Sequence, residues 1–411
     1  MAATAQPSNA RTRATRTGGA QPRALRLLAG AALAAMLASC TTVQTIGAGP
    51  VAAPSEAAAP GRWAFDDSRP AAERDGYRPP RKLAVLLPMS GSLATAAAPV
   101  RDGLLAGYYG ERRTRPELAF YDTTGTAAGT ASAYSRAIAE GADQVVGPLG
   151  REEVDALFHS PAQVPLIALN RGSVQAPDNA AAFSLAPEDE GDAAAQYLLR
   201  RNARNVLVLS NGEDAARRSV DALTARLAQN GGSVVATLAI VGDNPVDQTA
   251  ALQNALATGA GVDAVFLAIR GNQARVLAPQ LSVAGLATRP RLGSSLLAQG
   301  TGKAEEDQIL DGIVFPTESW STGASARSLP PLATVSRDLP TARGGAARLF
   351  AFGFDAWLLS GYLEHLTRTP DAAVGGATGM LRVAADGNVV RQPAWATWRN
   401  GHVVPQADAG G

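Results

Sequence analysis

The stretch RKLAVLLPMSGSLATAAAPVRDGLLAGYY, residues 81–109, decides the fold because it contains a strand, a turn and a helix in direct succession. Residues 83–87 are continuously apolar, and Pro88 interrupts the run. Beyond the turn, Val100 and Leu104 lie one helical turn apart, which is the spacing of an amphipathic helix. A short apolar strand followed by a helix is the first half of a βαβ unit. We therefore expect this strand to lie inside a parallel sheet, buried on both faces.

The same alternation of apolar runs and amphipathic segments continues along the chain. Two successive sets of strands are predicted, at 83–87, 118–121, 144–146 and 165–169, then at 205–209, 233–240, 262–269 and 313–315. Strands separated by helices predict parallel sheets covered by helices on both faces. The sequence therefore predicts an α/β fold of two doubly wound lobes, with the crossover near Ala186-Pro187-Glu188.

The pattern changes toward the C-terminus. A long apolar helix is expected at 347–366. Asp386-Gly387 is a dipeptide that favours a tight hairpin turn. Trp395 and Trp398 lie in a strand-like stretch that ends at Asn400-Gly401. We therefore assign to the first lobe residues 81–187 and 317–377, and to the second lobe residues 188–316 and 378–404.

The single cysteine, Cys40, follows a region with the features of a secretion signal. Several arginines precede an apolar stretch at 27–37, which is too short to cross a bilayer but fits a signal peptide. The residues Leu37-Ala38-Ser39-Cys40 resemble a bacterial lipobox, in which the cysteine is lipid-modified and the peptide before it is removed. A buried cysteine behind an ordinary signal peptide is the alternative.

The resemblance to a lipobox has consequences for location. It implies a signal peptide at 1–39 and a lipid anchor on Cys40, and Thr41 in the next position implies the outer membrane, with the protein facing the periplasm. Residues 40–80 are rich in Ala, Pro, Ser and Gly and show no sustained apolar period. We therefore expect them to form a flexible tether.

Composition excludes several kinds of chemistry. A formal net charge of +1 gives no electrostatic reason to expect nucleic acid. One cysteine and three widely spaced histidines leave no zinc-binding pattern, and we expect neither a metal nor a cofactor. The sequence lacks a Gly-x-Ser-x-Gly elbow and a Walker-type phosphate loop, so no catalytic residue is predicted. Asp355, an acid inside an apolar helix, is expected to be buried and hydrogen-bonded.

Several motifs, in order from about residue 82 to residue 400, resemble one known family. They are LLPMSG at 86–91, VGPL at 146–149, PLIALN at 165–170, FSLAPEDE at 183–190, FGFDAWLL at 352–359, and TGMLR at 378–382 with Trp395. Together they resemble the C-terminal domain of the LpoA/LppC-type penicillin-binding-protein activators, outer-membrane lipoproteins of Gammaproteobacteria. The resemblance implies a type I periplasmic-binding-protein fold. It also implies a non-catalytic regulator of peptidoglycan synthesis that binds and activates a class A penicillin-binding protein, a transpeptidase and glycosyltransferase.

A candidate cleft follows from the strand pattern. In open parallel sheets, ligands bind beyond the carboxyl ends of the strands. The residues expected there are Ser90, Gly91, Ser92, Asp122, Thr123, Pro148, Leu149, Asn170, Arg171 and Glu318. Ser90 and Gly91 either help to hold a carboxylate or carbonyl group, such as that of a small cell-wall-derived ligand, or only turn the chain and cap the next helix.

The alternative function is a lipid-anchored amino-acid or small-ligand binding protein of the branched-chain type. Such proteins usually place Ser or Thr hydroxyls shortly after a Gly-Pro pair to bind the substrate carboxylate. Here Gly147-Pro148 is followed by Leu149-Gly150-Arg151. This difference weakens the transport interpretation, and we expect weak or no binding of free leucine, isoleucine and valine.

Overall fold

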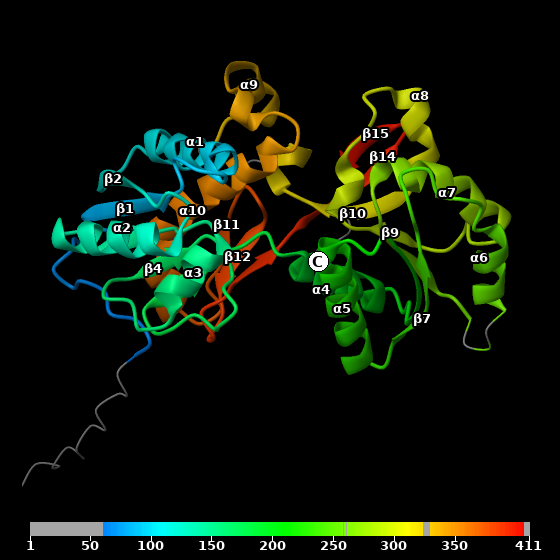
Figure 1. Cartoon of the computed structure of the whole chain (residues 1–411), viewed down its shortest axis with the longest axis horizontal. Helices are drawn as coiled ribbons and strands as arrows, with labels where there is room; N and C mark the ends of the chain where they lie inside the picture. Colours follow the sequence, from blue (N-terminus) through cyan, green and yellow to red (C-terminus); the bar gives the residue numbers. More distant parts are fainter. Residues whose placement is uncertain (1–60, 258, 260, 324–328, 407–411) are drawn as a thin grey trace, which may run out of the picture. The chain divides into compact units, whose positions relative to one another are not determined.

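The computed structural model describes residues 61–257, 259, 261–323 and 329–406. The predicted signal peptide at 1–39, the predicted lipidation site Cys40 and the part of the predicted tether before Gly61 lie outside these residues. The described part contains two large sheets covered by helices on both faces, so the predicted α/β fold of two lobes is confirmed (Figure 1).

The first lobe is built on a five-stranded parallel sheet with the order β2-β1-β3-β4-β5. The strands are β1 (Lys82–Leu87), β2 (Glu117–Asp122), β3 (Gln144–Val146), β4 (Leu166–Ala168) and β5 (Ala180–Ala182). Its helices are α1 (Ala94–Gly110), α2 (Ala127–Ala139), α3 (Arg151–Phe158) and α10 (Ala346–Arg368). Along β1, Val85 faces one hydrophobic cluster and Leu86 faces the other, on the opposite side of the sheet. This two-sided burial explains the continuous apolar run at the start of the quoted stretch.

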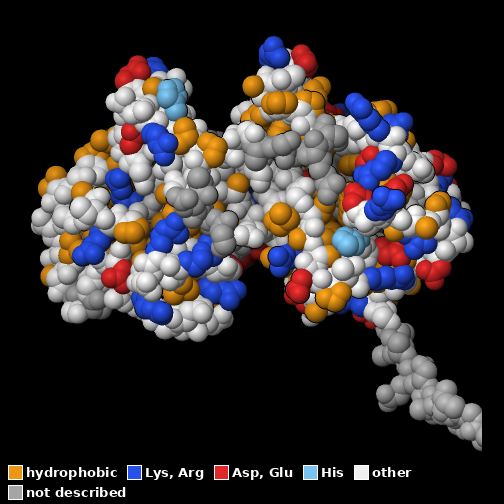
Figure 2. Space-filling model, turned by 180° about the vertical axis from the view of Figure 1, so that it is seen from behind, with side chains coloured by type: hydrophobic (Ala, Val, Ile, Leu, Met, Phe, Trp, Pro, Cys, Tyr) orange, Lys and Arg blue, Asp and Glu red, His pale blue; other side chains and the backbone are white. Residues whose placement is uncertain are grey.

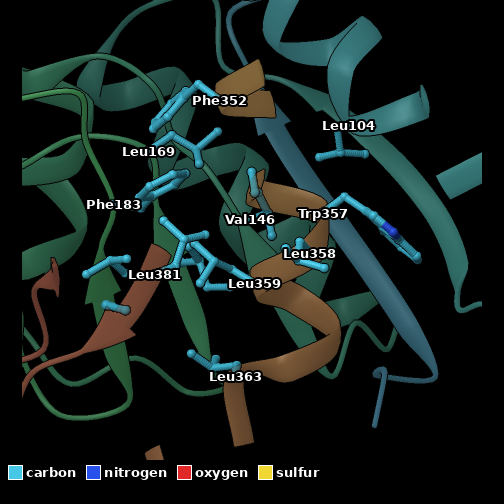
Figure 3. Close-up of a cluster of buried hydrophobic side chains, with 14 of the residues drawn as sticks. Leu104, Val146, Leu169, Phe183, Phe352, Trp357, Leu358, Leu359, Leu363 and Leu381 are labelled. Carbon is cyan, nitrogen blue, oxygen red and sulfur yellow. The ribbon is translucent and has the colours of Figure 1, made fainter. Parts of the chain in front are cut away.

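Two helices of the first lobe, α1 and α10, pack closely against each other. A Cβ on Gly103 would overlap the carbonyl group of Phe350, and a Cβ on Gly353 would overlap that of Val100. The absence of both side chains therefore lets the two backbones meet. Figure 3 shows the core beside these helices, formed by Leu104, Val146, Leu169, Phe183, Phe352, Trp357, Leu358, Leu359, Leu363 and Leu381.

The second lobe is built on a seven-stranded sheet with the order β15-β14-β10-β9-β8-β6-β7. The strands are β6 (Asn205–Ser210), β7 (Ser233–Ala239), β8 (Ala264–Ala268), β9 (Arg291–Gly293), β10 (Ile313–Thr317), β14 (Ala394–Arg399) and β15 (His402–Pro405). The helices are α4 (Pro187–Arg200), α5 (Asp214–Gln229), α6 (Thr249–Leu256), α7 (Gly271–Val283) and α8 (Ala304–Asp307). β14 confirms the strand expected to end at Asn400-Gly401, and it pairs antiparallel with β15.

Between α10 and β14 in the sequence, the chain forms a small antiparallel sheet. It consists of β11 (Val374–Gly375), β12 (Met380–Val383) and β13 (Val389–Gln392). The turn at Asp386-Gly387 connects β12 to β13, as predicted. Leu381 and Val389 belong to the core of the first lobe. The assignment of all of 378–404 to the second lobe was therefore wrong, because the apolar face of this hairpin covers the first lobe and only β14 and β15 join the second sheet.

The second half of the predicted tether is also part of the fold. Within residues 61–80, Trp63 packs against the core of the first lobe and Tyr77 is only 3% exposed. Arg69 is buried and donates a 2.6 Å hydrogen bond from Nη2 to Glu364 of α10. The prediction of a flexible tether up to residue 80 was wrong, because aromatic side chains anchor this segment.

The chain passes between the lobes three times. It leaves the first lobe after β5, returns after β10 toward α9 (Leu332–Asp338) and α10, and leaves again between β13 and β14. Short 3₁₀ helices lie at Ser295–Ala298, Gln308–Leu310, Ser319–Thr322 and Pro340–Ala342.

The outer surface carries side chains of every kind. Figure 2 shows basic, acidic and hydrophobic side chains interspersed over one face, in keeping with a formal net charge of +1.

Candidate functional site

The turn after β1 is held by Asp122, at the end of β2. Its Oδ1 accepts hydrogen bonds from the backbone N–H groups of Met89 at 2.9 Å, Ser90 at 3.3 Å and Thr124 at 2.8 Å. Its Oδ2 accepts the hydroxyl of Ser90 at 2.7 Å. The hydrogen bond from the Ser90 hydroxyl is the main reason that the pKa of Asp122 lies below its usual value. These side chains bind each other, which fits the turn-forming interpretation of Ser90.

The other predicted residues near this turn shape the backbone or lie apart from the Asp122 cluster. Gly91 has a φ of +81°, a backbone conformation that favours glycine. Ser92 is exposed, whereas Thr123 is fully buried and donates its backbone N–H to the carbonyl oxygen of Leu87 at 3.1 Å. The structure thus brings Ser90, Gly91 and Asp122 together, but as a closed turn.

The ends of β3 and β4 are connected through Asn170. Its Nδ2 donates to the carbonyl oxygen of Leu149 at 3.0 Å, and its Oδ1 accepts the backbone N–H of Arg171 at 2.9 Å. Leu149 itself packs against the first-lobe core, next to Pro148. Arg171 extends to the second lobe, where its Nη2 donates to Asp189 of α4 at 2.8 Å. Arg171 therefore belongs to a contact between the lobes.

A largely buried group of charged and polar residues connects the two lobes, and we call it the interlobe seam. Its members are Arg171, Asp189, Glu190, Ser295, Glu318, Arg348 and Arg391. Arg348, at the start of α10, lies 2.6 Å from Glu190 and 2.9 Å from Glu318. It also donates a 2.7 Å hydrogen bond to the Ser295 hydroxyl. Ser295 in turn donates its backbone N–H and its hydroxyl to Glu190, at 3.0 and 2.8 Å.

Opposite charges in the seam stabilise each other's ionised forms at Glu190 and Arg348. Burial alone would raise the pKa of Glu190, but Arg348, Arg391 and the hydrogen bonds from Ser295 outweigh it, so the pKa is lowered. Burial alone would lower the pKa of Arg348, but Glu190 and Glu318 outweigh it and raise the pKa. Both partners therefore remain charged near neutral pH. Asp189 differs, because burial raises its pKa despite the contact with Arg171.

Sequence reasoning found only part of this seam. It placed Arg171 and Glu318 at strand ends and grouped them with Ser90 and Asp122, which form a separate cluster in the structure. It missed Glu190, Arg348 and Arg391. Three consecutive acids at the start of α4 were a signal for Glu190. An isolated arginine carries no such signal in a chain whose basic residues are nearly all arginine.

The described part of the chain has two cavities that none of the predicted cleft residues lines. One, of about 260 Å³, lies between α4 and α5 and is lined by Glu188, Asp189, Asp192, Ala222, Ala225, Arg226 and Gln229. The other, of about 290 Å³, is lined in part by Trp398 and His402 of the β14–β15 hairpin.

Within the described ranges, no three His, Cys, Asp or Glu side chains gather as metal ligands would. No helix in this part of the chain has the length and apolarity to cross a membrane.

The whole two-lobed body matches one family. A family model described as "LppC putative lipoprotein" matches residues 77–401, from the segment before β1 to the β14–β15 turn. The chain belongs to the LppC family. The match begins inside the segment that precedes β1 and covers every strand of both large sheets except β15, which starts one residue after the match ends. The predicted family is therefore confirmed.

Curated members of the family carry a functional name. "Penicillin-binding protein activator LpoA" of Dickeya chrysanthemi (strain Ech1591) is 27% identical over 323 residues, which is 69% of this chain and 46% of that protein. The protein of the same name from Klebsiella pneumoniae subsp. pneumoniae is 26% identical over 320 residues, 70% of this chain and 44% of that protein. The chain thus spans about half the length of the curated relatives it matches.

Solved structures agree on the fold. The "LpoA (YraM) C-domain from Haemophilus influenzae, a regulator of PBP1A" superposes with a TM-score of 0.67 at 21% identity, over 79% of this chain and 100% of that one. A "putative branched-chain amino acid ABC transporter" from Chromobacterium violaceum ATCC 12472 gives a TM-score of 0.62 at 28% identity, over 77% and 99% of the two chains. The LppC chain therefore has the fold that regulators and binding proteins share.

Proposed function

We propose that this LppC protein is a non-catalytic lipoprotein of the outer membrane that binds and activates a class A penicillin-binding protein during peptidoglycan synthesis. The observation that carries the proposal is the family match over residues 77–401, together with relatives named as activators of a penicillin-binding protein. The match includes both lobes, so the surface available for a partner is that of the whole described body.

The arrangement of charged groups suits a regulator better than an enzyme. In the interlobe seam, Glu190 contacts Arg348, and its pKa is lowered although the side chain is buried. A carboxylate held by an arginine has a stabilised charged form and is a poor proton acceptor. A regulator needs no reactive group, because it acts by binding one state of its partner more tightly than another. A difference of about 1.4 kcal/mol shifts such an equilibrium tenfold.

A small-ligand binding protein is the second candidate, since the Chromobacterium violaceum structure covers the chain at 28% identity. The turn after β1 argues against this candidate. There Asp122 accepts three backbone N–H groups and the Ser90 hydroxyl, which are the donors that a substrate carboxylate would need. Calorimetric titration with leucine, isoleucine and valine separates the two candidates. We expect no saturable heat. A dissociation constant in the micromolar range, about −8 kcal/mol, would favour the binding protein.

The activator function is tested with the full chain and the class A synthase of the same cell. Labelled lipid II is supplied in detergent, and cross-linked product is measured with and without the LppC protein. We expect faster cross-linking in the mixture and no product from the LppC protein alone. A heat-unfolded sample of the same protein is the control. If the folded protein neither binds nor stimulates any class A synthase of that cell, the proposed function is wrong.

A further inference from the structure

The edges of the two large sheets differ in how they are protected. An edge strand presents unpaired backbone N–H and C=O groups, and native proteins cover these groups or place charges, prolines or bulges beside them. β2 has the acidic residues Glu117 and Asp122 at its two ends, and β15 ends at Pro405. β5 is only three residues long and forms a bridge with Asn388. β7, the remaining edge, has neither a charged residue nor a proline in its sequence SVVATLA.

One stretch of β7 directs backbone groups outward. Ile240, directly after the strand, donates its N–H to the carbonyl oxygen of Ser210 on β6 at 2.8 Å. Backbone groups of a parallel strand point alternately toward and away from its neighbour, so the N–H and C=O groups of Thr237 and Ala239 point away from β6. Both residues are exposed, and β7 is the border strand of the sheet (Figure 1). These two residues therefore offer donors and acceptors to another extended chain.

A bulge limits this stretch on one side. The pairing with β6 skips Val235, which is an extra residue of β7. Bulges of this kind interrupt pairing at a sheet edge. From Ala236 onward the register with β6 is regular, and Val241, just beyond the strand, is 81% exposed. The part of the edge that is open to pairing is therefore the uncharged segment 236–241.

The charges beside the two ends of β7 have opposite signs. Arg204 is exposed beside the start of the strand, where its carbonyl oxygen accepts the N–H of Ser233 at 2.8 Å. Asp263 lies at the same end, but its carboxylate accepts two backbone N–H groups, at 3.0 and 2.9 Å. Asp243 and Asp247, both exposed, follow the other end of the strand. A strand with the same distribution of charge, laid antiparallel to β7, would bring a basic end beside an acidic end.

We propose that β7 pairs antiparallel with β7 of a second copy of this chain, so that the second sheets of the two copies become continuous. About a two-fold axis at Leu238, Thr237 of one copy lies opposite Ala239 of the other, and the two residues exchange both backbone hydrogen bonds. The same axis brings Arg204 of each copy toward Asp243 of the other. Because the paired segment is uncharged, no like charges meet at the axis. The proposal is independent of synthase activation, since it concerns contact between copies of this chain alone.

Sedimentation equilibrium of the full chain in detergent solution tests whether the dimer forms. We expect the mass to rise from one copy to two as the protein concentration increases. Thr237→Pro removes an outward N–H group and no hydrogen bond to β6, and Ala239→Lys places a charge on the edge. Each should weaken the dimer about tenfold or more, because every lost contact is lost twice in a symmetric pair. Ala287→Lys, the same substitution at an exposed alanine between α7 and β9, is the control and should dimerise as the natural chain does.

Hydrogen exchange shows which edge is used. We expect peptides that cover residues 233–241 to exchange more slowly at high protein concentration than at low concentration. Peptides that cover β2, the acidic edge of the first sheet, should exchange equally at both concentrations.

Charge reversal tests the two-fold arrangement. Arg204→Asp and Asp243→Arg should each weaken the dimer about two- to twentyfold, since an exposed ion pair occurs twice in it. The two substitutions combined in one chain should restore the affinity, because the pair forms again with reversed signs. A purely structural role of either residue would not be restored in this way.

Three results would overturn the proposal. One is a chain that remains a single copy at every concentration, and another is a dimer that Ala239→Lys leaves unchanged. The third is protection of residues 233–241 that arises only when a class A synthase is added, because the occupant of the edge would then be the synthase. Since Ala239 is exposed, the lysine variant should keep the Tm of the natural chain, so loss of the dimer can be distinguished from unfolding.

Discussion

Asp355 shows how a single residue connects distant parts of the first lobe. It lies in the middle of α10 with no exposed surface, and it accepts the backbone N–H of Ala377 at 2.6 Å. The backbone N–H and hydroxyl of Thr378 donate to it at 2.7 and 2.6 Å. Gly376 leaves space for this carboxylate, since a Cβ there would meet it. The sequence predicted a buried, hydrogen-bonded acid here, and the structure confirms it.

Burial is the main influence on the pKa of the Asp355 carboxyl. It raises the pKa of Asp355 to about 6, although the hydrogen bonds from Thr378 and Ala377 act in the opposite direction. Because the folded pKa lies above the usual value of 3.8, the associated stability is fully present below pH 3.8. It is lost as the pH rises through about 6.

Asp355→Asn tests both the hydrogen bonds and the titration. The amide keeps one acceptor and turns an NH₂ group toward donors, so we expect the free energy of unfolding to fall by about 1–3 kcal/mol. The difference from the natural chain should be larger at pH 4 than at pH 7, since the contribution of Asp355 is lost over that interval and the variant has no carboxyl there to titrate. Urea unfolding at both pH values measures it. A difference that is independent of pH would show that Asp355 does not titrate in this range.

At the scale of elements, the contact of α1 with α10 depends on glycine. Gly353→Ala places a methyl group against the carbonyl of Val100, so the helices must separate. Overpacking of this kind costs about 1–3 kcal/mol. Gly375→Ala is the control, because nothing lies within 4 Å of a Cβ at that position. Scanning calorimetry should show a lower Tm for Gly353→Ala and little change for Gly375→Ala. Equal effects of both would contradict the packing argument.

The elements differ in how well the sequence predicted them. Apolar runs such as 83–87 predicted strands because burial on both faces leaves a strong local pattern. Residues 61–80 were misassigned because their composition resembles a linker, although Trp63 and Tyr77 were a signal that they are anchored. The hairpin of β12 and β13 was recognised from its turn, but only the folded chain shows which lobe its apolar face covers.

The candidate site was less predictable than the strands, because local sequence patterns do not show which distant segments meet. Asp122 is the last residue of β2 and Ser90 follows β1, its neighbour in the sheet, so their proximity could be inferred from the order of the sheet. Arg348 and Arg391 come from a helix and from a small sheet that sequence reasoning had divided between the lobes. Their approach to Glu190 depends on how the chain passes three times between the lobes, which no local pattern encodes.

At the scale of the whole molecule, the predicted anchor decides where the protein acts. Cys40 is the single cysteine of the chain, so Cys40→Ala removes the one thiol available for lipid attachment. We expect the variant to lose palmitate labelling and to leave the membrane fraction, because acyl chains supply about 0.8 kcal/mol of membrane affinity per CH₂ group. The natural chain, labelled in parallel, is the control. A variant that still incorporates palmitate would contradict lipidation at Cys40.

The interlobe seam makes the two lobes depend on each other. Arg348 extends from α10 of the first lobe to Glu190 and Ser295 of the second, and it also contacts Glu318 after β10. Glu190 and Glu318 are only 4% and 7% exposed. Removing the arginine therefore leaves two buried carboxylates without their ion-pair partner, whereas removing one acid leaves the other to pair with Arg348.

Arg348→Ala should accordingly be more damaging than Glu318→Gln. We expect a loss of about 3–5 kcal/mol in the free energy of unfolding, the usual cost of breaking a buried ion pair from one side. Because the lost contacts join the lobes, the single calorimetric transition expected of the natural chain should separate into two. Adding Glu190→Gln to Arg348→Ala should restore part of the loss, since one unpaired charge is removed. Arg382→Ala, at an exposed position, is the control. If Arg348→Ala unfolds in one transition at an unchanged temperature, the seam does not couple the lobes.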